Sequence, residues 1–140
     1  MNLERAIEIA VEAHKGVKDK GGNPYILHPL RVMFSLASED EKIVGVLHDV
    51  VEDSHWTFEG LIKEGFASEV IEGLKSVTKA ADDEDYAAFV RRALQNKIGR
   101  NVKIADITDN LDVRRMGDLT PKDLERLNKY KKSLQVLSSN

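Results

Sequence analysis

The segment Ile43–Asp53, with the sequence IVGVLHDVVED, places an apolar run directly before a histidine and three carboxylates. On a helix, residues three and four positions apart share a face, so Glu52 is expected beside His48 and Asp49. An apolar stripe would bury the same helix, and it consists of Ile43, Val46, Leu47, Val50 and Val51. Carboxylates crowded in this way repel one another, and a cation is their natural neutraliser. The alternative is an acidic, solvated helix end that holds no ligand.

Helical spacing of apolar residues recurs along the chain, and no segment shows sustained two-residue alternation. The pattern therefore predicts an all-α fold of about seven to eight helices. We expect helices over residues 3–14, 25–36, 38–53, 57–65, 69–77, 86–96, 102–116 and 120–137.

Cap residues predict where several of these helices begin. Thr57 and Ser68 are expected N-caps. Thr120 to Asp123 is a strong helix start, because a threonine cap precedes a proline and an acidic residue follows three positions after the cap. The last helix is expected to bury Leu124, Leu127, Leu134 and either Val136 or Leu137.

The composition is that of an ordinary globular protein, with 41% apolar and 32% charged residues. The 140 residues fit one domain, residues 1–140, with a sizeable core. A net charge of −3 gives no basic footprint for nucleic acid. The chain has no cysteine, which excludes disulfides and a cysteine-bound zinc site. No apolar run approaches the length of a membrane span or resembles a signal sequence, so we expect a cytoplasmic enzyme or binding domain.

Residues 15–24 form an expected loop with three lysines and paired glycines. Such a loop can bring backbone N–H groups and ammonium groups close to phosphate, although a solvated turn is the simpler explanation of its composition. His28 follows this loop, and Pro29 is suited to the first turn of a helix. His28 is therefore expected at a helix entrance. A lone histidine in such a place is more often structural than a metal ligand.

Five blocks of the sequence together resemble the hydrolase domain of the RelA/SpoT family, a group of HD-domain metallophosphohydrolases. The blocks are Ala13-His14-x-Gly16, Gly22-Asn-Pro-Tyr-Ile-x-His28-Pro29, Leu47-His-Asp-Val-Val-Glu-Asp53, Val77-Thr-Lys79 and Lys103-Ile-Ala-Asp106-x-x-x-Asn110. The resemblance is strongest to the small alarmone hydrolases, and it extends from about Leu3 to Tyr130. It implies the HD-domain helical bundle.

The resemblance implies a divalent metal, typically manganese, held by His28, His48, Asp49 and Asp106. Two imidazoles and two carboxylates with open positions suit Mn²⁺ or a similar ion better than a closed structural zinc site. Glu52 and Asp53 match the family pair that positions and activates the attacking water. The implied reaction is hydrolysis of a nucleoside 3′-pyrophosphate, which releases pyrophosphate.

The resemblance also implies residues that contact a small-molecule nucleotide substrate, namely Lys18, Asp19, Lys20, Asn110, Arg126 and Tyr130. Each of the last three has a simpler alternative. Asn110 could be a polar residue on a helix face, Arg126 a surface cation and Tyr130 a core aromatic residue with a solvated hydroxyl group.

Some positions depart from the family pattern. The family usually carries arginine at the position of Asp19, in the loop that meets the base, and glutamine at the position of Val17. The family sequence Arg-Leu-His-Asn-Met-Arg is replaced by residues 107–112, ITDNLD. These changes affect base recognition rather than the metal ligands.

Two functions are alternatives to a nucleoside 3′-pyrophosphohydrolase. One is another HD phosphohydrolase, acting on 5′-mononucleotides or on the 2′-phosphate of NADPH, and the other is a nucleotide-binding regulatory module with little turnover. The retained Glu52 and Asp53 argue against the last.

Overall fold

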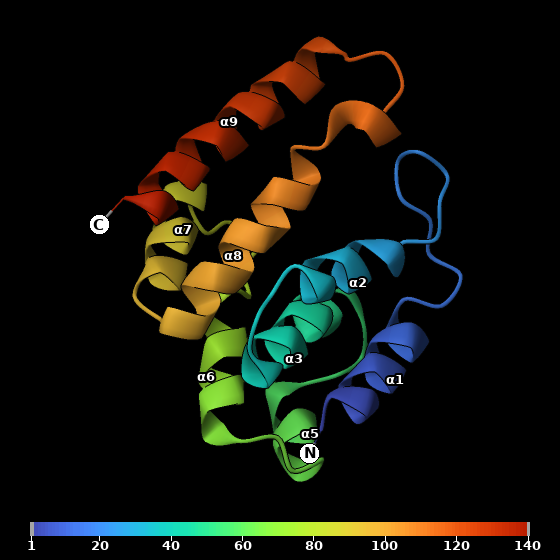
Figure 1. The fold of residues 1–140 in the computed structure, drawn as a ribbon, viewed down its shortest axis with the longest axis vertical. Helices are drawn as coiled ribbons and strands as arrows, with labels where there is room; N and C mark the ends of the chain where they lie inside the picture. Colours follow the sequence, from blue (N-terminus) through green and yellow to red (C-terminus); the bar gives the residue numbers. More distant parts are fainter. Residues whose placement is uncertain (1, 140) are drawn as a thin grey trace.

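The structure, a computed structural model, describes residues 2–139, and these residues form nine α-helices, one short 3-10 helix and no β-strand. The all-α prediction is confirmed. The helix count exceeds the expected seven to eight because α4, a single turn, is separate from α3. The elements, most of them labelled in Figure 1, are α1 Leu3–Ala13, α2 Leu27–Phe34, α3 Glu39–Leu47, α4 Val50–Asp53, α5 Phe58–Lys63, α6 Ser68–Ser76, α7 Tyr86–Leu94, α8 Lys97–Asn110, η1 Val113–Arg115 and α9 Pro121–Ser138.

Helix α3 is the central helix of the molecule, and every residue from Ile43 to Leu47 is buried. It packs against α1, α2, α6 and α8. Figure 1 shows α1 on one side of α3, with α8 and α9 side by side on the other. A smaller apolar cluster of Val90, Ile107 and Leu137 joins α7, α8 and α9. The apolar stripe that precedes His48 therefore anchors the centre of the core, as the sequence predicts.

The start of α9 confirms the expected capping box. The Thr120 hydroxyl accepts from the Asp123 backbone N–H at 3.1 Å, and the Asp123 carboxylate accepts from the Thr120 N–H at 3.0 Å. The expected burial of Leu124 is wrong, because this side chain is 51% exposed. Figure 1 shows the reason: the first turn of α9 extends past the end of α8. At the other end Leu137, not Val136, is buried.

Of the two expected N-caps at α5 and α6, one is confirmed and the other is wrong. The Thr57 side chain accepts from the Gly60 N–H, as expected of an N-cap. The prediction for Ser68 is wrong, because Ala67 is the N-cap and Ser68 is the first helical residue. The Ser68 hydroxyl instead donates to the Glu69 carboxylate at 2.6 Å. None of the helices in the described part of the chain is long and apolar enough to cross a membrane.

Candidate active site

The chain does not continue as one helix through the histidine and the acidic residues. Helix α3 ends at Leu47, and α4 begins at Val50. The His48 Nδ1–H donates to the Gly45 carbonyl at 2.6 Å, so the imidazole forms a hydrogen bond with a backbone carbonyl in the last turn of α3. Residues 48 and 49 therefore occupy a break between two helices, and the helical spacing that places Glu52 beside His48 does not apply there.

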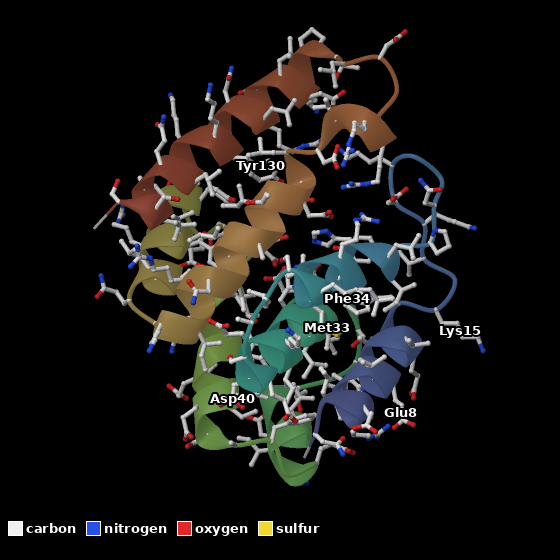
Figure 2. The ribbon with its side chains drawn as sticks, in the orientation of Figure 1. Glu8, Lys15, Met33, Phe34, Asp40 and Tyr130 are labelled. Carbon is white, nitrogen blue, oxygen red and sulfur yellow. The ribbon has the colours of Figure 1, made fainter. Side chains whose placement is uncertain are left out.

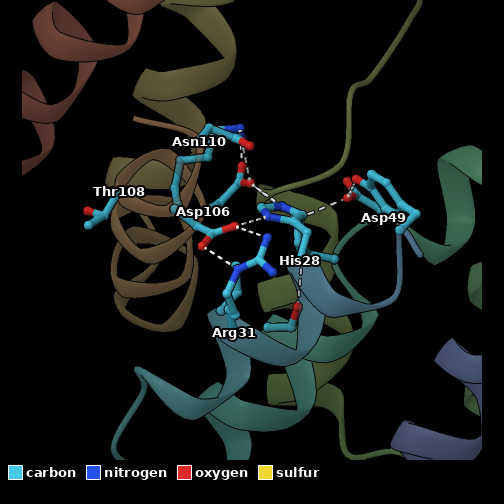
Figure 3. Close-up of polar contacts among 12 residues, drawn as sticks. His28, Arg31, Asp49, Asp106, Thr108 and Asn110 are labelled. Carbon is cyan, nitrogen blue, oxygen red and sulfur yellow. Dashed lines mark hydrogen bonds and ion pairs between the residues drawn. The ribbon is translucent and has the colours of Figure 1, made fainter. Parts of the chain in front are cut away.

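Helices α2 and α8 and the break between α3 and α4 bring the four predicted metal ligands together, as Figure 3 shows for His28, Asp49 and Asp106. His28 is the second residue of α2, and Asp106 lies on α8. Ligand atoms of His28, His48 and Asp49 all lie within 4.8 Å of one another. The Asp106 Oδ1 atom lies 2.9 Å from His28 Nε2 and 3.3 Å from His48 Nε2. The four side chains thus converge on one point.

The environment of His48 fits a metal ligand. Its Nδ1–H is used by the Gly45 carbonyl, so Nε2 carries the lone pair of the neutral ring. Nε2 is buried and has no hydrogen-bond partner among residues 2–139. The carboxylates of Asp49 and Asp106 lie near it, at 3.2 and 3.3 Å. A buried nitrogen without a hydrogen bond beside two carboxylates is the donor set that a divalent cation would complete.

The pKa values of the histidines and of Asp49 in this cluster also indicate a site for a positive charge. Burial disfavours the charged form of His48, but Asp49 and Asp106 outweigh it and raise its pKa well above the usual value. Burial is likewise outweighed at His28, whose pKa is raised by its hydrogen bonds to Asp106 and Asp109. Burial favours the neutral form of Asp49, yet His48 holds its pKa at about 2. Protons on the histidines therefore occupy the place that a metal cation would take.

Three hydrogen-bond donors hold the carboxylates of Asp49 and Asp106 in place. The Tyr25 hydroxyl donates to Asp49 Oδ2. The Lys103 ammonium, which is buried, donates to Asp106 Oδ2 at 3.2 Å, and the Asn110 amide donates to Asp106 Oδ1 at 3.2 Å. Asn110 thus touches a predicted metal ligand as well as the substrate cavity described below.

Asp109 is a site residue that was not predicted from the sequence. Its Oδ2 atom lies 2.6 Å from His28 Nδ1, which leaves His28 Nε2 to face Asp106. It also accepts two hydrogen bonds from Arg31. Metal-binding histidines usually donate their second nitrogen to such a carboxylate. The signal in the sequence is the spacing, since Asp109 follows Asp106 by three residues on one helix.

Glu52 and Asp53 have different surroundings. The Glu52 carboxylate is exposed and accepts from the Lys79 backbone N–H at 2.6 Å. Arg92 donates to the Thr78 carbonyl at 2.7 Å and thereby holds the same loop. Asp53 is also exposed, but it lines the cavity of the site, where partial burial, followed by the charges of Asp49 and Glu52, raises its pKa to about 6.

A cavity of about 650 Å³ opens over His28. Tyr25, Asp53 and Asp109 also line it. The other metal-ligand candidates do not line the cavity but lie close to His28. The structure brings to this one cavity all six residues expected to contact substrate, Lys18, Asp19, Lys20, Asn110, Arg126 and Tyr130. Figure 2 shows Tyr130 between α9 and α8. Arg31 and Arg115 line the cavity as well and were not among the predicted residues.

Comparison with known proteins gives the following relatives. No protein-family model matches the chain. The chain is 33% identical to the guanosine-3′,5′-bis(diphosphate) 3′-pyrophosphohydrolase of Aquifex aeolicus, over 78% of its own length and 17% of the relative. It is 32% identical to a probable GTP pyrophosphokinase of Mycobacterium leprae, over 97% of its length and 18% of the relative. It is 28% identical to the bifunctional (p)ppGpp synthase/hydrolase SpoT of Escherichia coli, over 97% of its length and 21% of the relative.

The chain therefore spans about a fifth of the length of these curated relatives. Among solved structures it matches a metazoan ortholog of SpoT that hydrolyses ppGpp and plays a role in starvation responses, with a TM-score of 0.80. The match covers 98% of this chain and 85% of that one at 22% identity, and it shows that the two share a fold.

Proposed function

Because this chain is similar to the RelA/SpoT hydrolase type over nearly its whole length, we propose that it is a metal-dependent nucleoside 3′-pyrophosphohydrolase. Its substrates would be alarmones of the (p)ppGpp type. The observation that carries the proposal is the convergence of His28, His48, Asp49 and Asp106. His28 also lines a cavity to which lysine and arginine side chains contribute.

The donor set fits a divalent cation, and we propose Mn²⁺ or a similar ion. Imidazole nitrogens and carboxylate oxygens together suit such an ion, and cysteine, which a structural zinc site would commonly use, does not occur in the chain. When bound, the metal would lower the pKa of water and screen the charge of the phosphoryl group. His28, His48, Asp49 and Asp106 would hold it.

Asp53 is the side chain best placed to take the proton of the attacking water. It lines the cavity, and a pKa of about 6 allows it to accept a proton near neutral pH. The water oxygen bonds to the phosphorus nearest the ribose, and the bond from that phosphorus to the 3′ oxygen breaks. The 3′ oxygen leaves and takes up one proton, which balances the proton that Asp53 accepts from the water. The products are pyrophosphate and a nucleotide with a free 3′-hydroxyl group. Glu52, through the Lys79 N–H, holds the loop beside the site.

A substrate panel with added manganese and identification of the products tests the proposal. We expect pyrophosphate release from nucleoside 3′-diphosphates and little release of phosphate from 5′-mononucleotides or NADPH. Rapid hydrolysis of a 5′-mononucleotide, with the 3′-diphosphates left intact, would contradict the proposal and favour the other HD phosphohydrolase activity.

The same panel tests the base preference through Asp19. A carboxylate cannot donate to the O6 and N7 acceptors of guanine, whereas the N6 amino group of adenine can donate to it. We therefore expect guanosine and adenosine 3′-diphosphates to be hydrolysed with similar kcat/KM, and Asp19→Arg to shift the preference toward guanosine. Asp19 Oδ1 also accepts from the Asn23 N–H at 2.9 Å. Asp19→Asn, which can keep this bond, is the matched control for loop structure. A strong guanosine preference in all three proteins would exclude Asp19 from base recognition.

A further inference from the structure

The Asp109 carboxylate gathers one histidine and two arginine side chains at one end of the cavity. Its Oδ2 atom lies 2.6 Å from His28 Nδ1. Arg31 donates to both of its oxygens, from Nε at 2.8 Å and from Nη2 at 3.1 Å. Arg115 Nη2 donates to the Asp109 carbonyl at 2.8 Å and to Oδ2 at 3.2 Å. One carboxylate thus positions two guanidinium groups side by side.

Arg31 and Arg115 each have N–H groups that are available to bind a ligand. Both line the cavity, and their side chains are 34% and 29% exposed. Within the described residues, Arg31 Nη1 and Arg115 Nε donate to no protein atom. Asp112 is the second carboxylate near Arg115, but it is shared with Arg114. Arg31 and Arg115 therefore face the carboxylates of Asp109 and Asp112, and each guanidinium group keeps N–H donors that the described residues do not use.

The arginine pair is separated from the metal ligands by the ring of His28. The Nε2 edge of the ring faces Asp106, and the Nδ1 edge faces Asp109. Figure 3 shows Arg31 beside His28, between α2 and α8. A phosphoryl group held at the metal site would thus lie on the other side of this ring from the arginines. The pair is placed for a second phosphate group of the same ligand.

The loop that carries Lys18 and Lys20 forms the part of the cavity wall next to Arg115. This loop approaches η1 so closely that a Cβ atom on Gly21 would lie 2.8 Å from the Arg115 carbonyl oxygen. Lys18, Lys20 and Arg115 all line the cavity. An anion at the arginine pair would therefore be enclosed by cations from two segments that are far apart in the sequence.

We propose that Arg31 and Arg115 form a subsite for the 5′-phosphate group of the nucleotide. This inference rests on the proposed 3′-pyrophosphohydrolase function and adds to it a requirement for phosphate at the opposite end of the ribose. Guanidinium groups suit the role because they bind phosphate through two parallel hydrogen bonds. Asp109 is the positioning residue that holds both of them.

Arg115→Ala tests the subsite, and Arg114→Ala is its matched control. Arg114 pairs with the same Asp112, is 86% exposed and is not among the described residues that line the cavity. The substrates are guanosine 3′-diphosphates with a 5′-diphosphate or with a free 5′-hydroxyl group. We expect Arg115→Ala to lose about tenfold or more in kcat/KM on the first compound. On the second compound, and for Arg114→Ala on both, we expect less than a threefold change.

Two further measurements distinguish an effect on 5′-phosphate binding from an effect on metal binding or on the rate of hydrolysis. Manganese affinity should be the same in Arg115→Ala as in the wild type. Calorimetric titration with GDP and guanosine should show that GDP binds the wild type more tightly, and that Arg115→Ala removes this difference.

Three results would overturn the subsite: equal loss on both substrates, no loss on either, or lost manganese binding in Arg115→Ala. Failure of the wild type to release pyrophosphate from either compound would instead overturn the proposed function. In that case the comparison of GDP with guanosine still decides whether the arginines bind a 5′-phosphate group.

Discussion

His48 lies at the end of α3 and is also a proposed metal ligand, so its local structure bears directly on metal binding. Its Nδ1–H bond to the Gly45 carbonyl accompanies the end of α3 and orients the ring. The same bond fixes the tautomer in which Nε2 can bind a cation. Asp49, the next residue, is in the break between α3 and α4 rather than within a helix, and its carboxylate reaches the same point.

The two acidic residues after this break should differ in function. Asp53→Asn removes the proton acceptor that lines the cavity, so we expect kcat to fall by about 10²- to 10⁴-fold while manganese binding is retained. Glu52→Gln keeps an oxygen that can accept from the Lys79 N–H, so its loss should be less than about tenfold. Steady-state kinetics and metal analysis of the two variants check this. A larger loss in Glu52→Gln would assign proton transfer to Glu52 instead.

At the scale of single residues, the sequence predicted which side chains meet but not all of their pairings. The ligand set and Asn110 follow from motifs, because a motif records residues that converge in a fold. The other five cavity residues lie outside the five motif blocks and follow from the wider family resemblance. The partners of His28 do not follow from them. Asp109 and Arg31 meet only because α2 packs against α8, and this contact joins residues 78 positions apart. The direction of Glu52 was missed because the helix breaks at His48.

At the scale of elements, close packing of α2 on α3 sets the distance between His28 and His48. Gly45 lies at the contact, where an added Cβ atom would be 2.7 Å from Leu36 Cδ1 and 3.3 Å from Val32 Cγ1. Both of these side chains are buried, so they have little room to move. Helix periodicity predicts that α2 and α3 exist, but it gives no information on how closely they approach.

Gly45→Ala should therefore weaken both the fold and the metal site. Overpacking costs about 1–3 kcal/mol, and the better helix propensity of alanine offsets up to about 1 kcal/mol of it. We expect a lower free energy of unfolding and weaker manganese binding, measured by denaturant titration and calorimetry. Gly117→Ala is the control, because nothing lies within 4 Å of its added Cβ atom. Unchanged stability and metal affinity in Gly45→Ala would show that the contact does not constrain the site.

At the scale of the whole molecule, the pH dependence of stability should differ between the metal-free and the metal-bound protein. The raised pKa values of His28 and His48 contribute stability that is present below about pH 6.5 and lost as pH rises through the folded-state values. The lowered pKa values of Asp49 and Asp106 contribute stability above about pH 4 that is lost on acidification. The metal-free protein should thus be most stable between these limits.

Thermal unfolding with EDTA or with manganese, at pH 5, 6.5 and 8, checks this expectation. The Tm of the metal-free protein should fall from pH 6.5 to 8. The manganese-loaded protein should not show this fall, because the cation replaces the protons on the histidines. A rise in the Tm of the metal-free protein over the same interval would contradict the proposed proton–metal competition.

The number of manganese ions bound per chain, measured by equilibrium dialysis, tests the metal centre most directly. We expect one tightly bound ion in the wild type and in Glu59→Ala, a control at an exposed residue of α5. Asp49→Ala should bind no ion while its circular dichroism spectrum retains the helical content. Full occupancy in Asp49→Ala, or no bound manganese in the wild type, would contradict the account.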